Sequence, residues 1–284
     1  MCAATEISDI TIREIDEVAQ MRAVEELQKE VWGTSDLDVV PLTHLVATRE
    51  AGGVLIGAFD GETLVGFIYG FPGFDRGRLA HHSHMLAVKP EYRNSDLGRR
   101  LKLAQREYVI AQGIGLMTWT FDPLQSLNAH FNFTKLGVVS DRYLINFYGE
   151  DAASFLHRTG TDRLWVSWFL ITERVNERIS GVSEDVNPNL GRPLVEVEVD
   201  DSPRRNRLTE GLAHDYASIE IPANINALQQ ERLDTALRWR EDTRWAFIEA
   251  IKAGYFVAGF VRETRDEQRI GRYLLRKGKV LELA

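Results

Sequence analysis

The sequence predicts a mixed α/β fold, in which short strands and amphipathic helices alternate along the chain. Two apolar runs, at residues 53–59 and 64–70, flank an Asp-Gly turn, which is a typical β-hairpin signal because glycine accepts positive φ angles. Residues 97–112 carry apolar side chains at helical spacing, and a further apolar run of strand length follows at 116–121. Strands and helices that follow one another in this way predict a layered α/β domain.

The same two periodicities predict the other elements of the first part of the chain. Alternation of apolar and polar residues indicates a strand at 7–13, and helical spacing indicates helices at 16–31 and 41–48. Farther along, the patterns predict a Gly/Arg-rich loop at 71–78, strands at 82–88, 138–148 and 164–172, and a helix at 124–136.

The last third of the chain has its own strand and helix patterns. We expect one long helix at 224–253, with Asn224 as its N-cap and Gly254 as its stop, and we interpret its charges and Arg204-Arg205 as a solvated helix face. Strands are predicted at 194–199, 217–221, 255–261 and 272–276. Polar residues precede this part, so we predict a domain at 1–175, a linker at 176–193 and a C-terminal α/β half-domain at 194–284.

Composition excludes several functional classes. The chain has 284 residues, with 34 basic and 42 acidic side chains and a formal net charge of −8, whereas general binders of nucleic acid or anionic membranes are more often basic. Its only cysteine, Cys2, can form neither an intrachain disulfide nor a cysteine zinc cluster. We find no signal peptide and no apolar run of about 20 residues, the length of a membrane span, so we expect a cytoplasmic protein.

A phosphate-binding loop is predicted between the strand that ends at Val88 and the helix that begins at Leu97. A loop that enters a helix N-terminus directs several backbone N–H groups at one point, and the helix dipole adds positive potential there. Arg93, Arg99 and Arg100 supply local positive charge for phosphate oxygens. The segment is therefore suited to a phosphate or pyrophosphate group.

The spacing of residues around this loop resembles the signature of the GNAT acyltransferase superfamily, Leu-x-Val-x-Pro-x-x-Arg-x-x-Gly-x-Gly or Ala. The matching residues are Leu86, Val88, Pro90, Arg93 and Gly98. Asp96 stands where the family usually has its first loop glycine. Aspartate tolerates left-handed backbone angles and can cap a helix, so we expect the loop to form with aspartate at this position.

The downstream sequence follows the same family layout. A strand ending near Trp119 is followed by a helix that contains Asn128, Ala129 and Asn132, and then by Lys135-Leu-Gly137. The resemblance covers roughly residues 7 to 172. It implies a mainly antiparallel sheet flanked by helices, in which two central parallel strands, near Leu86 and Thr118, splay apart to receive the pantetheine arm of acetyl-CoA or another acyl-CoA. The cofactor-binding residues that it implies are Leu86, Ala87, Val88, Arg93, Asn94, Ser95, Asp96, Leu97, Gly98, Arg99, Asn128 and Asn132.

Two histidines are the candidate catalytic residues. The family's usual carboxylate position falls near His82, and His82 and His84 share one face of the predicted strand. An imidazole with a pKa of about 6.5 is a competent base at cytosolic pH. The family's usual tyrosine position holds Phe133, and a thiolate can leave without a dedicated acid because the pKa of a thiol is about 8.5.

Other interpretations of these residues stay open at this point. The histidines could simply line a strand end, and His81, His82 and His84 could form a metal site, although adjacent strand residues point to opposite faces. We expect Asp122 to face the reaction centre.

The resemblance is to a bacterial GNAT subgroup with a C-terminal extension, which implies transfer of an acetyl or succinyl group to a small amine, possibly an amino acid. A homodimer is also expected as a possible assembly. The alternative is a non-catalytic, regulatory acyl-CoA-binding protein, because Asp96 and Phe133 replace groups that the family ordinarily uses. Dinucleotide binding is less favoured, since the loop contains no G-x-G-x-x-G turn.

Overall fold

The computed structural model describes residues 10–33, 35–93, 95–149, 158–182 and 191–280. Contacts divide the chain into two compact units, with the boundary between Thr118 and Trp119. The predicted boundary at 176–193 lies well inside the second of these units. Each unit has its own buried core.

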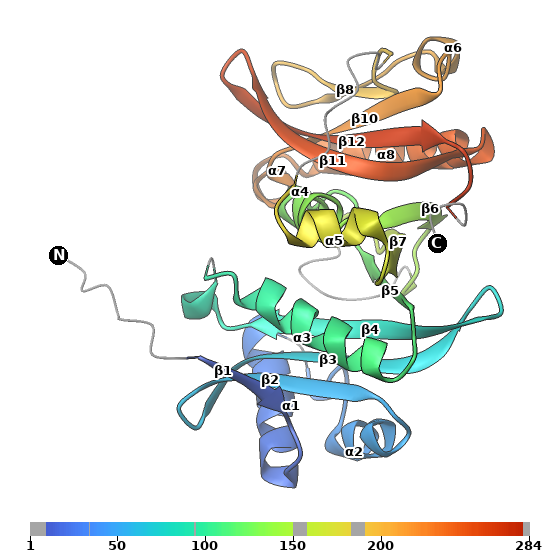
Figure 1. Cartoon of the computed structure of the whole chain (residues 1–284). Helices are drawn as coiled ribbons and strands as arrows, with labels where there is room; N and C mark the ends of the chain where they lie inside the picture. Colours follow the sequence, from blue (N-terminus) through green and yellow to red (C-terminus); the bar gives the residue numbers. More distant parts are fainter. Residues whose placement is uncertain (1–9, 34, 94, 150–157, 183–190, 281–284) are drawn as a thin grey trace. The chain divides into compact units, whose positions relative to one another are not determined.

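The sheet of the first unit has the strand order β1-β2-β3-β4-β5 (Figure 1). All its neighbours are antiparallel except β4 and β5, which are parallel. The strands are β1 (Thr11–Glu14), β2 (Val54–Asp60), β3 (Thr63–Asp75), β4 (Arg78–Val88) and β5 (Leu116–Phe121), and β5 continues across the boundary. The helices are α1 (Val18–Trp32), α2 (Leu42–Glu50), the 3₁₀ turn η1 (Pro90–Tyr92) and α3 (Leu97–Ala111).

Helices cover both faces of this sheet. Helices α1 and α2 bury one face, where Met21, Leu45 and Phe67 belong to a single apolar cluster that also contains Ala87. Helix α3 packs on the opposite face (Figure 1). Leu86, which precedes Ala87 in β4, points to that face, because a Cβ atom added to Gly98 of α3 would lie 3.8 Å from the Leu86 side chain. Successive residues of β4 therefore serve different layers, as the strand pleat requires.

The predicted loop at 71–78 is wrong, because β3 and β4 continue almost to the end of their hairpin. Phe74 pairs with Leu79 and Asp75 with Arg78, and the turn between them consists of Arg76 and Gly77, with φ angles of 49° and 78°. Two successive positive φ angles give the turn the twist that paired antiparallel strands require. The Gly and Pro residues of β3 hid this pairing, since they usually mark loops.

The sheet of the second unit has the order β7-β6-β11-β12-β10, with a small separate β8-β9 sheet. The strands are β6 (Val139–Leu144), β7 (Arg163–Phe169), β8 (Val195–Val197), β9 (Pro203–Arg205), β10 (Tyr216–Pro222), β11 (Tyr255–Arg265) and β12 (Gln268–Lys277). The helices are α4 (Ser126–Ala129), the π-helical turn η2 (His130–Lys135), α5 (Glu173–Ile179), α6 (Leu208–Gly211), α7 (Ile225–Glu231) and α8 (Leu233–Lys252).

Aromatic side chains fill the core of the second unit. Tyr273 contacts the rings of Phe133, Phe247 and Phe260 at centroid distances of 5.8, 5.0 and 4.8 Å. These rings come from η2, α8, β11 and β12. The C-terminal third of the chain therefore shares one core with the segment that contains Phe133, and β6 pairs with β11 through Ser140 and Val257.

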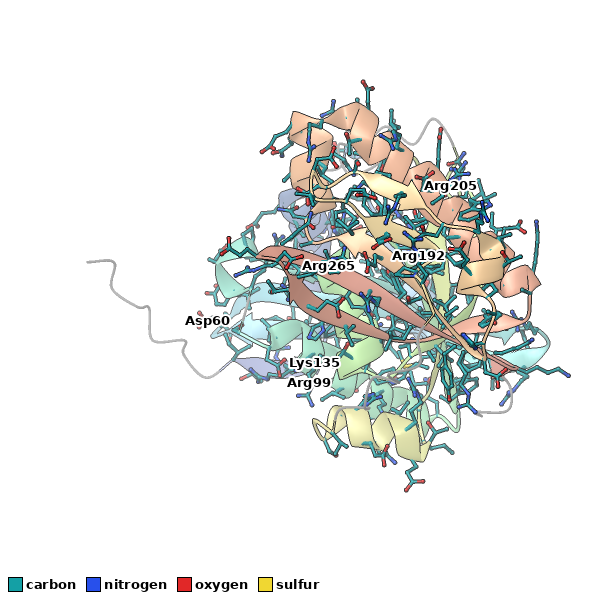
Figure 2. The ribbon with its side chains drawn as sticks, turned by 90° about the horizontal axis from the view of Figure 1, so that it is seen from above. Asp60, Arg99, Lys135, Arg192, Arg205 and Arg265 are labelled. Atoms are coloured by element: carbon teal, nitrogen blue, oxygen red, sulfur yellow. The ribbon has the colours of Figure 1, made fainter. Side chains whose placement is uncertain are left out.

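Three predictions for the second unit are wrong. The segment predicted as a linker, 176–193, includes the end of helix α5, where Arg178 is buried, and its residues 183–190 lie outside the described ones. The long helix is two helices, because the backbone at Arg232 leaves the helical region with φ −143° and ψ 70°. Arg205 lies on strand β9 and forms an ion pair with Asp242 of α8 (Figure 2), so it belongs to no helix face.

Several predictions are confirmed. Asn224 caps α7 by accepting a hydrogen bond of 3.2 Å from the Ala227 amide. The mixed α/β class is confirmed, with a mainly antiparallel arrangement and one parallel pair of strands. Within the described ranges, the helices lack the combination of length and apolar character that crossing a membrane requires.

Candidate active site

Strand β4 has a backbone edge that does not pair with β3. The Lys89 amide donates to the Val65 carbonyl at 2.9 Å, so Lys89 forms a hydrogen-bonded pair with β3. Such pairs alternate along an antiparallel ladder, so Leu86 and Val88 direct their amide and carbonyl groups to the opposite edge. The Val88 carbonyl accordingly accepts a hydrogen bond of 3.2 Å from Arg93 Nε.

Among the described residues, β5 pairs with this opposite edge at two positions only, His81↔Met117 and His82↔Thr118. The edge formed by Leu86 and Val88 is therefore beyond the parallel ladder. Ala87, also predicted to bind the cofactor, has the opposite orientation. Its backbone faces Phe67 of β3 and its side chain is buried in the core.

The segment after β4 forms a turn that leads directly into α3. Ser95 Oγ donates to the Tyr92 carbonyl at 2.5 Å, and Asp96 has a left-handed backbone with φ 59° and ψ 9°. The Arg100 amide donates to the Asp96 carbonyl at 3.0 Å, which is a first-turn helical bond. The amides of the preceding residues, Leu97, Gly98 and Arg99, have no acceptor inside the helix.

The start of α3 therefore has the properties of an anion site. Three backbone N–H groups point out of the helix, and the helix dipole adds positive potential at the same end. Gly98 has room around it, since an added Cβ atom would meet only Leu86, at ordinary contact distance. The site lies beside the free edge of β4 because Leu86 is the neighbour of Gly98.

The charged side chains of the loop have distinct partners. Asp96 does not cap the helix; its carboxylate accepts from Arg99 at 3.2 Å, and both side chains are partly exposed. On the other side of the loop, Tyr92 donates to Asp60 at 2.7 Å (Figure 2 labels Asp60 and Arg99). Arg100 is turned away and donates to the Ile10 carbonyl at 2.7 Å. Asn94, another predicted cofactor ligand, lies outside the described residues.

The two candidate catalytic histidines lie together on the α1/α2 face of β4. Their rings are 6.2 Å apart, and Phe71 of β3 contacts both, at 5.6 Å from His82 and 5.8 Å from His84. His82 Nδ1 lies 3.1 Å from Thr118 Oγ1 of β5. The prediction that these two side chains share one face is confirmed.

A β-bulge adds a residue to this part of β4. Gly70 pairs with Ser83 and Tyr69 with Met85, so His84 is the extra residue between them. Bulges occur often beside active sites, where they redirect side chains. Burial beside the rings of Tyr69 and Phe71 lowers the pKa of His84, and the charge of His44 lowers it further, so the His84 imidazole is neutral at pH 7.

The remaining predicted cofactor ligands, Asn128 and Asn132, belong to the second unit. Asn132 is buried, and its Oδ1 accepts a hydrogen bond of 3.2 Å from Trp119 Nε1, so it holds a core tryptophan. Asn128 is exposed on α4. Phe133, which occupies the family's usual tyrosine position, is buried between Phe121 and Tyr273 and has no hydroxyl group of its own. The loop at α3 belongs to the first unit.

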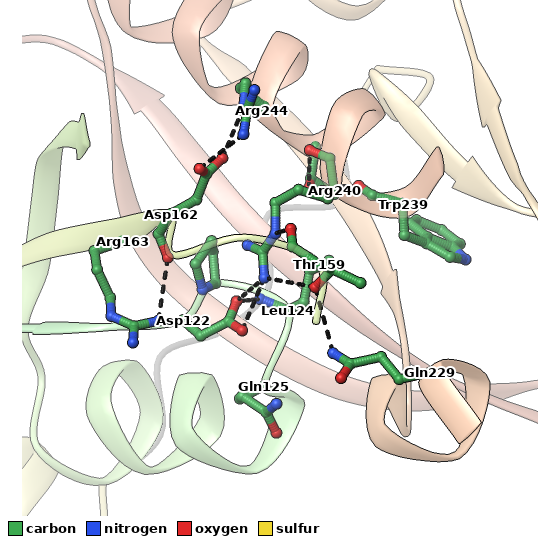
Figure 3. A network of polar contacts seen from close by, with 12 residues as sticks. Asp122, Leu124, Gln125, Thr159, Asp162, Arg163, Gln229, Trp239, Arg240 and Arg244 are labelled. Carbon is green, nitrogen blue, oxygen red and sulfur yellow. Dashed lines mark hydrogen bonds and ion pairs between the residues drawn. The ribbon is translucent and has the colours of Figure 1, made fainter. Parts of the chain in front are cut away.

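Asp122 is not available for a reaction centre. It is 8 % exposed, and both of its carboxylate oxygens accept from Arg240 Nη2 at 2.8 Å (Figure 3). The Leu124 amide donates to the same carboxylate at 2.9 Å. The expectation that Arg240 lies on a solvated helix face is therefore wrong.

Sequence reasoning also missed two buried polar residues of α3, Lys102 and Gln105. Both lie on the buried side of the helix, with Leu101 and Val109. The helical spacing of these four positions was the available signal, but polar residue types are usually assigned to the solvent face. No three His, Cys, Asp or Glu side chains in the described part of the chain are grouped so that they could hold a metal ion.

The first half of the chain is similar to a known protein family. The model of the Acetyltransferase (GNAT) family matches residues 16–138. No curated protein matches the sequence.

Among solved structures, aminoglycoside 6'-acetyltransferase type Ii is similar at 21% identity and a TM-score of 0.46, over 57% of this chain and 97% of that one. The ribosomal-protein-S18-alanine N-acetyltransferase from Escherichia coli is similar at 12% identity and a TM-score of 0.46, over 64% of this chain and 99% of that one. The family match covers residues 16–138, which contain the β4–α3 loop and both histidines, and the chain extends well beyond this match.

Proposed function

We propose that this protein is an acyl-CoA-dependent N-acyltransferase. The observation that carries the proposal is the position of the α3 N-terminus, whose three outward amides lie beside the backbone edge of Leu86 and Val88 that does not pair with β3. The amides and Arg99 would bind the CoA pyrophosphate, and the β4 edge would hydrogen-bond the amide groups of pantetheine. The match of residues 16–138 to the acetyltransferase family model supports the same assignment.

His82 is the proposed general base, and His84 is its alternative. The amine nitrogen attacks the thioester carbonyl carbon, and the imidazole takes the proton that the nitrogen loses. The C–S bond then breaks, and CoA leaves as a thiolate, which is a tolerable leaving group because the pKa of a thiol is about 8.5. A neutral imidazole is needed for this role, and burial beside Tyr69 and Phe71 keeps His84 in that form.

The finer assignments rest on the family resemblance. We propose an acetyl or succinyl group as the acyl group, a small amine such as an amino acid as the acceptor, and the cytoplasm as the location. The C-terminal part of the chain would form a homodimer interface.

The test combines binding with catalysis. Titration calorimetry with acetyl-CoA and succinyl-CoA measures affinity, and a thiol-release assay over a set of amine acceptors measures transfer. We expect binding of at least one acyl-CoA and thiol release that depends on an acceptor. Absence of binding to both donors would refute the proposal.

Replacing His82 by alanine tests the proposed base. Loss of a general base typically lowers turnover about 10²–10⁴-fold, so kcat should fall while the Kd for acyl-CoA stays close to that of the wild type. His44→Ala is the matched control, since His44 contacts Tyr69, a member of the same aromatic group. An unchanged kcat and pH profile in His82→Ala would assign the base to His84 or to solvent.

The second candidate function is non-catalytic acyl-CoA binding. The burial of Phe133 among core rings favours it, because no hydroxyl is available there to protonate the leaving thiolate. Tight binding without thiol release for any acceptor would support this alternative.

A further inference from the structure

Four buried polar side chains form a hydrogen-bonded chain between α3 and β4. Lys102 Nζ donates to Ser83 Oγ at 2.7 Å, and Ser83 Oγ donates to Gln105 Oε1 at 2.7 Å. Gln105 Nε2 lies 3.3 Å from His81 Nε2, which completes the chain. We call these four residues, His81, Ser83, Lys102 and Gln105, the α3–β4 relay.

The α3–β4 relay is built into the core. Its members are between 0 and 4 % exposed, so water does not compete for these hydrogen bonds. The relay lies directly over Gly70 of β3. A Cβ atom there would lie 2.8 Å from Gln105 Nε2 and closer still to His81 Nε2, so only glycine leaves room for it.

The α3–β4 relay joins the part of β4 that leaves the parallel ladder to the helix whose N-terminus forms the anion site. His81 is the first of the two β4 residues paired with β5, and Ser83 follows the last of them, so the relay holds β4 where it leaves the parallel ladder. On the helix side, Lys102 and Gln105 lie about 8 and 12 Å along the axis from Leu97, at 1.5 Å per residue. The other contact, between Leu86 and Gly98, is at the anion site itself.

We propose that Ser83, Lys102 and Gln105 are positioning residues that set the axial register of α3 against β4. This inference rests on the proposed function: the α3 amides and the β4 edge must bind two ends of one cofactor at once. Apolar packing alone permits small slides of a helix along a strand, whereas directional hydrogen bonds at two successive turns of α3 do not. The relay thereby keeps the pyrophosphate site at the correct distance from the pantetheine site.

The experiment compares a long ligand with a short one. Gln105→Met removes the hydrogen bonds to Ser83 and His81 with little change in side-chain volume. We expect its KM for acetyl-CoA to rise about tenfold, the equivalent of roughly one hydrogen bond. Its KM for S-acetylpantetheine, which lacks the pyrophosphate, should change less than twofold.

Gln112→Met is the matched control. Gln112 lies just beyond the other end of α3 and also donates a side-chain hydrogen bond, to the Gly52 carbonyl at 3.0 Å. It is remote from the relay, so both KM values should match those of the wild type. Lys102→Met and Ser83→Ala test the same relay should Gln105→Met fail to fold, and each should show the same selective rise.

Three outcomes would overturn the inference. An acetyl-CoA KM equal to that of the wild type in a folded relay variant would show that packing alone sets the register. Equal losses for acetyl-CoA and S-acetylpantetheine would indicate general disorder of β4. Absence of acyl-CoA binding by the wild-type protein would instead refute the proposed function, and the inference with it.

Discussion

The two units bury polar groups in opposite ways. In the first unit, the α3–β4 relay contains a lysine and a histidine but no carboxylate among its four members. In the second unit, charges are matched: Asp122 pairs with Arg240 and Asp162 pairs with Arg244, at 2.7 to 2.9 Å (Figure 3). The lysine and histidine of the α3–β4 relay are shifted towards their neutral forms, whereas the carboxylates and arginines of the second unit stay charged.

The pKa values follow from this difference. Burial lowers the pKa of Lys102 well below its ordinary value, and it lowers that of His81 to about 3, with the charges of Lys102 and His82 adding to the effect. Burial alone would lower the pKa of Arg240, but the charge of Asp122 and the neighbouring Tyr143 raise it. Burial alone would likewise raise the pKa of Asp162, but hydrogen bonds from Arg244, the Asn146 amide and Tyr143 lower it. The first cluster is therefore sensitive to pH, and the second is sensitive to loss of a partner.

The largest effect is expected in the charged cluster. Asp122→Ala leaves the Arg240 guanidinium buried without its carboxylate, which should lower the free energy of unfolding by about 3–5 kcal/mol. Chemical denaturation measures this loss. Glu249→Ala, which breaks an exposed pair with Lys252 on α8, should change stability by about 0.5 kcal/mol or less.

A double variant sharpens this prediction. Adding Arg240→Met to Asp122→Ala removes the unpaired charge, so much of the lost stability should return. If Asp122→Ala cost no more than Glu249→Ala, the buried pair would not be the feature that holds α8 against the segment after β5.

The next effect is a pH dependence in the uncharged cluster. The pKa of His81 is about 3 in the folded state and about 6.5 in the unfolded chain, so between these values only the unfolded state binds the proton. Stability should consequently fall as the pH is lowered through this window, at up to about 1.36 kcal/mol per pH unit from this group. His81→Gln should lose less stability than the wild type on acidification from pH 6.5 to pH 3.

His214→Gln is the control for the histidine prediction, because His214 is exposed and lies in the second unit. Its stability should follow the wild-type pH profile. Parallel profiles for His81→Gln and the wild type would show that His81 does not titrate in this window in either state.

A smaller effect is expected from adding one carbon atom to β3. Gly70→Ala places a Cβ atom 2.6 Å from the His82 carbonyl oxygen as well as against the relay, so the strand or the relay must shift. Overpacking of this kind costs about 1–3 kcal/mol. Gly73→Ala, three residues along the same strand, meets nothing within 4 Å and should leave the midpoint of thermal unfolding unchanged.

The smallest effect concerns an exposed charge rather than a buried one. Asp96→Gly relieves a left-handed backbone with φ 59° and frees Arg99 from its carboxylate partner. We expect CoA affinity, measured by calorimetry, to stay the same or to rise a few-fold, since an exposed pair contributes about 0–1 kcal/mol. Asp96→Asn separates the two causes, because asparagine tolerates the same backbone but lacks the charge. A clear loss of affinity in both variants would give the Asp96 carboxylate a positive role.

Local signals predicted the elements nearest the candidate site. Helix α3 and strand β5 follow from periodicity, and the anion site follows from the spacing of Val88, Arg93 and Gly98, because a strand, a turn and a helix N-terminus are defined by neighbouring residues. Elements shaped by distant partners were not predicted. The end of helix α5 was included in the predicted linker because its sequence is polar, and this helix is held by residues far away in the chain, as where Arg174 donates to the Ala258 carbonyl.

The sequence by itself determined the similarity to the acetyltransferase family, the α/β class and the loop that begins α3, since each depends on short-range spacing. Tertiary structure decided which polar residues are buried: Arg240 and Asp122 are 118 positions apart, and Lys102 and Ser83 are on different elements. A charged or polar side chain can be buried in a core only where a hydrogen-bonding or oppositely charged partner is present, or where a shifted pKa makes the side chain neutral. That condition is set by contacts across the fold, and no local pattern of residues encodes it.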